Sequence, residues 1–86
     1  MKVVLPPALR SYSKEKSEVQ AIGKTLTEVL ADLDRRYPGL RFRIIDEQEG
    51  IRPHIKIFIN QTQTKNINET LDSTDKILII CALSGG

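Results

Sequence analysis

The chain has 86 residues, a formal net charge of +2 and 40% hydrophobic residues. This length suits one domain with a thin core, which argues against a deep internal active site. Thirteen basic and eleven acidic residues, without a long run of one sign, and only two tyrosines and two phenylalanines argue against nucleic-acid binding.

Membrane insertion and secretion are not expected. The N-terminal sequence MKVVLPPALR lacks the apolar segment of a signal peptide. No stretch approaches the roughly 20 apolar residues that a membrane helix needs. The single cysteine cannot form an intramolecular disulfide. We therefore expect a cytoplasmic protein with no membrane partner.

The first elements are predicted to form a hairpin. Residues 2–5, KVVL, are typical of a short strand, and Pro6-Pro7 ends it because proline has no backbone N–H to donate. Polar and apolar residues alternate over 17–22, which predicts a half-buried second strand. The sequence RSYSKEK between the strands (10–16) is expected to be a long, hydrophilic loop.

The clearest signal is an amphipathic helix of about three turns that begins at Thr25. Thr25 and Glu28 have capping-box spacing, in which each side chain accepts a bond from a backbone N–H at the helix start. Pro38-Gly39 ends the helix. The apolar residues share one face and recur at helical spacing: Leu26, Val29, Leu30, Leu33 and Tyr37.

The second half predicts three strands. Residues 40–45 suit a short helical turn, and 46–50 suit a solvated loop. A strand is expected over 53–60, followed by a weaker one over 65–67. Residues 76–82 are apolar on both faces, which is typical of a central strand.

This order predicts an α+β domain of two layers, in which a mixed sheet of four to five strands carries one main helix on one face. Insertion of the last strand beside the first makes the arrangement a β-grasp (ubiquitin-like) fold. The domain is expected to span residues 1–82, and 83–86 to form a flexible Gly-Gly tail.

Several reactive side chains are expected to be structural. No nucleophile, acid or metal ligand can be placed beside His54, the only histidine, so a position at the sheet edge is expected. Cys81 shares a face with Ile77 and Ile79 and is expected to act as a small hydrophobe. The alternative is a functional thiol near the tail. The carboxylates of 46–49 are expected to be solvated, and no metal-ligand spacing is present.

Phe58 is expected on the sheet face that the helix leaves uncovered, because the isoleucines at 55, 57 and 59 would face the helix. Leu78 and Ile80 would share that face. The three residues would then form an apolar patch, which is a frequent mark of a partner surface. A sheet distortion that buries Phe58 is the alternative.

The chain closes on Gly85-Gly86. Without Cβ atoms, these residues can enter a narrow channel and present the terminal carboxylate for reaction. A carboxylate must be activated before it can be attacked, most simply by adenylation. The chain has no phosphate-cradling loop, so the ATP chemistry is assigned to a partner enzyme and no bound cofactor is expected.

These segments together resemble the ubiquitin-like sulfur-carrier family (MoaD/ThiS), over essentially the whole length. The closest pattern is that of the carriers for cysteine biosynthesis and of the small subunit of molybdopterin synthase. The matching segments are VLPPALR (4–10), TLTEVLADLDRRYPGL (25–40), IRPHIKIFIN (51–60), STDKILII (73–80) and Gly85-Gly86.

The resemblance implies a carrier that is not itself an enzyme. A ubiquitin-activating-type enzyme would adenylate Gly86 and introduce sulfur to give a thiocarboxylate, which then serves a downstream sulfur-accepting synthase. Leu83, Ser84 and Gly85 would thread the partner's active site. The pattern favours cysteine or a related sulfur metabolite as the destination.

Two departures from the family pattern concern local geometry. Cys81 stands where a proline usually precedes the tail, and NQTQTKN (60–66) replaces a glycine turn. Two other functions stay open: a ubiquitin-like modifier that is conjugated through Gly86 to lysines, and a non-covalent interaction domain.

Overall fold

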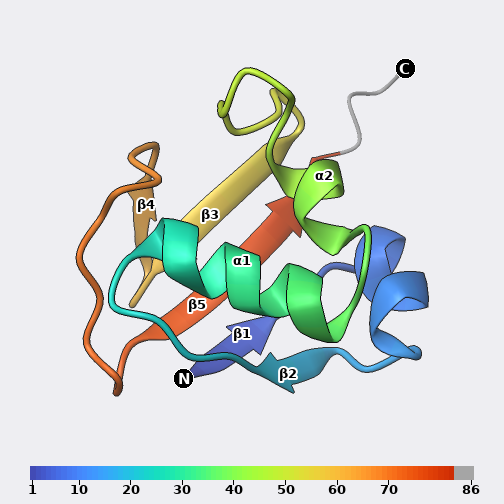
Figure 1. Cartoon of the computed structure of the whole chain (residues 1–86), viewed down its shortest axis with the longest axis horizontal. Helices are drawn as coiled ribbons and strands as arrows, with labels where there is room; N and C mark the ends of the chain where they lie inside the picture. The colour runs from blue at the N-terminus through green and yellow to red at the C-terminus, as the bar shows by residue number, and fades with distance from the viewer. Residues whose placement is uncertain (83–86) are drawn as a thin grey trace.

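The computed structural model describes residues 1–82. It shows a five-stranded mixed sheet with a helix packed across one face (Figure 1). The strand order is β2-β1-β5-β3-β4. The elements are β1 (Lys2–Val4), the 3-10 helix η1 (Pro7–Ser13), β2 (Glu18–Gln20), α1 (Leu26–Arg36), α2 (Leu40–Ile44), β3 (Ile55–Ile59), β4 (Thr62–Thr64) and β5 (Lys76–Cys81).

The predicted hairpin of β1 and β2 is confirmed, with Val3 opposite Val19 in an antiparallel pair. The connection, however, is not simply a loop. Pro6 and Pro7 start η1, because their φ is preset and the missing N–H groups would be unpaired there anyway. The Ser13 hydroxyl, at the end of η1, is buried and lies 2.7 Å from the Lys16 carbonyl oxygen.

Helix α1 begins as its capping box predicts. Thr25 Oγ1 accepts a hydrogen bond from the Glu28 N–H at 3.2 Å, and Glu28 Oε1 accepts one from the Lys24 N–H at 3.0 Å. The returning bond thus reaches one residue beyond the usual partner, the N-cap itself. The apolar face packs on the sheet and buries Leu26, Val29, Leu30 and Leu33.

Asp32 connects α1 by a hydrogen bond to the segment that follows β2. Its Oδ2 accepts hydrogen bonds from the Ile22 N–H at 3.0 Å and from Arg36 Nε at 2.8 Å, and Oδ1 pairs with Arg35. Burial alone would raise the pKa of Asp32, but the Ile22 and arginine bonds outweigh burial and lower it to about 2. Asp32 is therefore a buried charge with its partners in place.

The hairpin of β3 and β4 corrects one prediction. The strand expected at 65–67 is wrong, because β4 spans Thr62–Thr64. Asn60 and Gln61 have φ of 49° and 76°, both left-handed. Two such residues make the tight two-residue hairpin turn that suits the twist of paired strands, so β4 starts immediately. The segment 40–45 forms the predicted short helix, α2.

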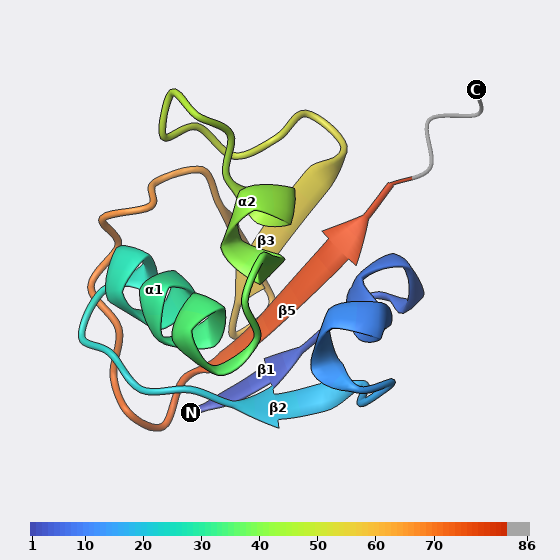
Figure 2. The same ribbon diagram turned by 45° about the vertical axis from the view of Figure 1, so that its right-hand side comes forward.

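Strand β5 lies at the centre of the sheet, as predicted. It pairs in parallel with β1 and antiparallel with β3. Figure 2 shows it running between these two strands toward the end of the sheet near η1. Ile77, Ile79 and, from β3, Ile57 face the helices and are at most 1% exposed. The core therefore lies between this face and α1.

Candidate functional site at the end of strand β5

The end of β5 is held on the sheet up to Ala82. Its N–H donates a hydrogen bond to the His54 carbonyl oxygen at 2.7 Å, one residue beyond the last strand pair, Ile55 with Cys81. The tail therefore starts from an anchored point. Residues Leu83, Ser84, Gly85 and Gly86 lie outside the described residues, so their roles stay predictions.

The uncovered face of the sheet carries an apolar patch, here called the open face: Val4, Phe58, Leu78 and Ile80. Phe58 lies directly opposite Leu78, and Val4 lies opposite Leu78 on its other side. Ile80, opposite Lys56, is 37% exposed. Phe58 is half-buried on this face, and its strand pairing is regular, so no distortion removes it from the face.

Sequence reasoning missed Val4 as a member of this face. Alternation in β1 indicates that Val3 and Val4 point to opposite faces, but the parallel register with β5 had to be known to place Val4 beside Leu78. These two residues line a hollow of about 420 Å³ with Asn60, Gln61 and Lys76. The turn between β3 and β4 therefore borders the open face.

Lysines surround the open face. Lys2 lies opposite Lys76, and the Lys2 ammonium is 3.6 Å from a Glu18 carboxylate oxygen. Lys56 lies beside Ile80 on β3. Glu18 lies opposite Val4 on the same face. The face is thus apolar in the centre and charged around it, with Lys56 and Lys76 as the lysines not paired with Glu18, a composition that suits a protein partner with polar groups around an apolar contact.

Cys81 is half-buried and packs against the core. This position agrees better with the expected role as a small hydrophobic residue than with the alternative of a functional thiol. Cys81 lines a hollow of about 340 Å³ with residues of η1 and α2, among them Tyr12 and Arg43, and with His54, which precedes β3. Arg43 Nε donates to the Tyr12 hydroxyl at 2.6 Å. Arg43 therefore has a structural partner at this position.

The structure supports a structural role for His54 and for the acidic loop. His54 is exposed, and its carbonyl, not its imidazole, makes the bond to Ala82. Asp46 Oδ1 accepts hydrogen bonds from the N–H groups of Gly50 and Gln48, both at 2.9 Å. These bonds lower the pKa of Asp46 and shape the loop, which the structure leaves solvated.

Two further findings concern residues 1–82. Nowhere in this part of the chain do three side chains of histidine, cysteine, aspartate or glutamate come close enough together to hold a metal ion. No helix of this part is long and apolar enough to cross a membrane.

Comparisons with known proteins extend over nearly the whole chain. The family model described as the ThiS family matches residues 3–86. The sulfur carrier protein CysO of Mycobacterium tuberculosis is 27% identical over an alignment of 89 positions. The alignment covers 98% of this chain and 96% of that protein.

Solved structures show the same fold. A chain in the crystal structure of the Amycolatopsis orientalis BexX/CysO complex is similar, with a TM-score of 0.90, 25% identity and coverage of 99% of this chain and 98% of that chain. The small archaeal modifier protein 1 of Methanosarcina acetivorans has a TM-score of 0.79 and 29% identity, with coverage of 99% and 94%. The predicted β-grasp fold is confirmed.

Proposed function

Because this chain belongs to the ThiS family, we propose that it is a sulfur carrier whose C-terminal Gly86 bears the sulfur. The observation that carries the proposal is the Gly85-Gly86 pair, which lies within four residues of Ala82, the anchored residue after the central strand. The similarity to CysO, a sulfur carrier protein, over nearly the whole of both chains supports it.

The proposed chemistry uses the chain as a substrate of partner enzymes. The Gly86 carboxylate attacks the α-phosphorus of ATP in a ubiquitin-activating-type enzyme, and pyrophosphate leaves. A sulfide-equivalent nucleophile then attacks the acyl carbon, a C–S bond forms, and AMP leaves with its oxygen. The product is a thiocarboxylate, which a downstream sulfur-accepting synthase uses.

The anchored strand end limits how a partner can reach Gly86. Four residues follow Ala82, and four extended residues span at most about 14 Å. The reactive centre of any partner must therefore come within that distance of Ala82. Ile80 lies two residues before Ala82, so the open face is within that distance, and we propose this face, with Phe58, Leu78 and Ile80, as the docking surface.

Intact-mass spectrometry tests the proposal directly. The chain is incubated with ATP, its activating enzyme and a sulfide source. We expect a mass gain equal to the difference between sulfur and oxygen, and no gain for the variant that lacks Gly86. The control is a variant that lacks Met1 and keeps the C-terminus intact, and it should gain the same mass. Sulfur uptake by the chain without Gly86 would contradict the proposal.

A second function is favoured by one finding, the similarity to small archaeal modifier protein 1. In that case Gly86 would form an isopeptide bond with lysine amines of other proteins. The same incubation in a cell extract distinguishes the two: a carrier gives one product of slightly higher mass, whereas a modifier gives a series of larger conjugates. Loss of the conjugates without Gly86 would establish the covalent link.

A further inference from the structure

The edge of the sheet beside the first half of β3 is open, because β4 covers only its second half. Ile57 and Ile59 pair with β4, but Ile55 has no partner there. The Asn66 N–H, which would meet Ile55 if β4 continued, donates instead to Thr64 Oγ1 at 3.1 Å. Thr64 is buried, and its hydroxyl donates in turn to Glu69 Oε1. The early end of β4 is therefore held by side-chain bonds.

The backbone of Ile55 offers an acceptor at this edge. The carbonyl of His54 and the N–H of Asn60 form hydrogen bonds with the chain of β5 and its flanking residues. Backbone groups of successive residues in a strand point to alternate sides, so those of the odd-numbered residues of β3 (55, 57 and 59) point toward β4. The Ile55 N–H bonds to the Arg52 carbonyl oxygen at 2.9 Å. The Ile55 carbonyl is thus left facing the open edge, where an incoming extended chain can donate an N–H to it.

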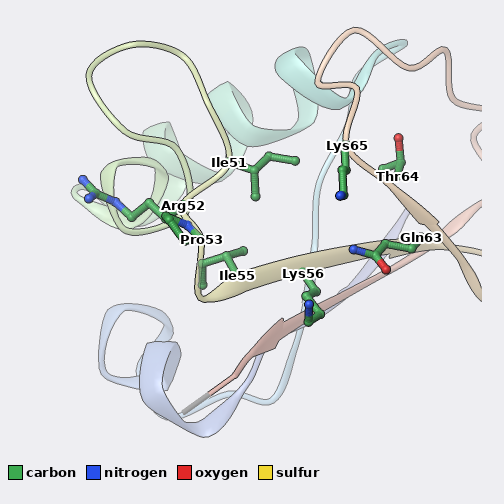
Figure 3. Close-up of a pocket in the computed structure, with 8 residues that line it drawn as sticks. All are labelled: Ile51, Arg52, Pro53, Ile55, Lys56, Gln63, Thr64 and Lys65. Atoms are coloured by element: carbon green, nitrogen blue, oxygen red, sulfur yellow. The ribbon is translucent and has the colours of Figure 1, made fainter. Parts of the chain in front are cut away.

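A hollow of about 440 Å³, here called the edge notch, lies at this position (Figure 3). Its apolar part comes from Ile51, Pro53 and Ile55, and its polar part from Lys56, Gln63, Thr64 and Lys65, with Arg52 at one end. In Figure 3, Lys65 points toward β3 from the chain after β4, and Arg52 points away from the notch.

The charge of the edge notch is positive and uncompensated. Arg52 is occupied, because its guanidinium lies 4.6 Å from the Phe42 ring centre and its Nε donates to the Phe42 carbonyl oxygen. Among residues 1–82, neither Lys56 nor Lys65 takes part in an ion pair. Of the residues that the structure describes, those that line the notch include no carboxylate. The two exposed ammonium groups are therefore available to an acidic ligand.

We propose that the edge notch binds an extended segment of a protein partner in which carboxylate side chains flank an apolar one. The apolar side chain covers Ile51 and Pro53, the carboxylates pair with Lys56 and Lys65, and one backbone N–H donates to the Ile55 carbonyl. This is the strand-addition mode of peptide recognition, limited to a short edge. It goes beyond the proposed sulfur transfer, because it needs neither Gly86 nor the apolar residues of the open face; Lys56 alone borders both surfaces.

The location gives the edge notch a use alongside the tail. Ile55 is paired with Cys81, so the notch lies one strand away from the end of β5. An enzyme that holds the tail can therefore reach the notch with a short acidic segment. Such a second contact would raise the affinity of the complex without adding to the chemistry.

Titration of the isotope-labelled full chain with acetyl-Glu-Val-Glu-Ile-Glu-Val-Glu-amide, followed by NMR, tests the proposal. We expect saturable amide shifts centred on residues 51–56 and 63–65. Lys65→Glu should weaken binding about fivefold, as expected when an exposed charge pair is lost and replaced by repulsion. Lys16→Glu, the same change at an exposed lysine outside the notch, should leave the affinity unchanged.

Several results would overturn the proposal. These are shifts centred on Phe58 and Ile80, equal binding of the peptide with lysine in place of glutamate, and unchanged affinity of Lys65→Glu. Equal binding of a heptaglutamate or a short oligonucleotide would show attraction by charge alone. Concentration-dependent shifts at the notch without peptide would assign it to a second copy of the chain. Because the assay involves no sulfur transfer, its failure leaves the proposed function untouched.

Discussion

The two faces of β5 differ although their residues are neighbours in sequence. Ile79 faces α1 and is 1% exposed, whereas Ile80 faces away from the helices and is 37% exposed. Both are isoleucines on the same central strand, so only the helix layer distinguishes them. One face of the strand holds the domain together, and the other is left for contacts outside it.

The largest effect is expected for the face of β5 that α1 covers, here called the covered face. Ile79→Ala should lower the free energy of unfolding by about 3 kcal/mol, because it removes buried methyl groups and leaves a cavity. Ile80→Ala, the matched change one residue later, should cost less than about 1 kcal/mol, because the side chain is already partly hydrated. Urea unfolding curves measure both. Equal losses for the two variants would contradict the division between the faces.

A smaller effect is expected for the contacts that Asp32 makes in the helix layer above the covered face. Asp32→Asn should lower the free energy of unfolding near neutral pH by on the order of 1–2 kcal/mol, because the charge on the Ile22, Arg35 and Arg36 bonds is lost. Because the folded pKa of Asp32 is lowered to about 2, this stabilisation is complete above about pH 4.

The pH dependence identifies the cause. The difference between wild type and Asp32→Asn should shrink as the pH falls from about 4 toward 2. In that interval the unfolded chain takes up a proton on this carboxylate, whereas the folded chain, in which the pKa is about 2, still holds it ionised. Unfolding curves at several pH values measure it, with Asp34→Asn as the comparison variant on the same helix. A difference that stays constant down to pH 2 would mean that the charge of Asp32 is not responsible.

The smallest effect tests the open face alone. Ile80→Thr keeps a β-branched residue in the strand but removes apolar contact area, so sulfur transfer by the activating enzyme should show a KM about fivefold higher, with kcat little changed. Ile22→Thr is the matched control, because Ile22 is 65% exposed but lies outside the open face. Steady-state kinetics compare the two. Equal changes in both variants would remove the open face from the proposed docking surface.

Local sequence signals were enough for much of the fold. Thr25 and Glu28 mark the start of α1 because both act within a few residues along the chain. Alternation in β3 and β5 places Phe58, Leu78 and Ile80 on one face once the strands are recognised. Both predictions depend on contacts between near neighbours in sequence.

The missed features depend on conformations or pairings that residue type does not specify. Gln61 adopts a left-handed φ that few non-glycine residues take, so nothing in the sequence indicated that β4 would begin at Thr62. The edge notch arises because Asn66 bonds to Thr64 instead of continuing the strand. Its position beside the end of β5 follows from the sheet order, a long-range property.

The parallel pair of β1 and β5 has a mechanical consequence. β1 begins at Lys2, β5 ends at Cys81, and the two strands run side by side in the same direction. A force that pulls the two termini apart draws these strands past each other, so that it loads their hydrogen bonds together instead of opening them one at a time. A partner that pulls on the end of β5 while the start of β1 is held therefore loads this strand pair in shear.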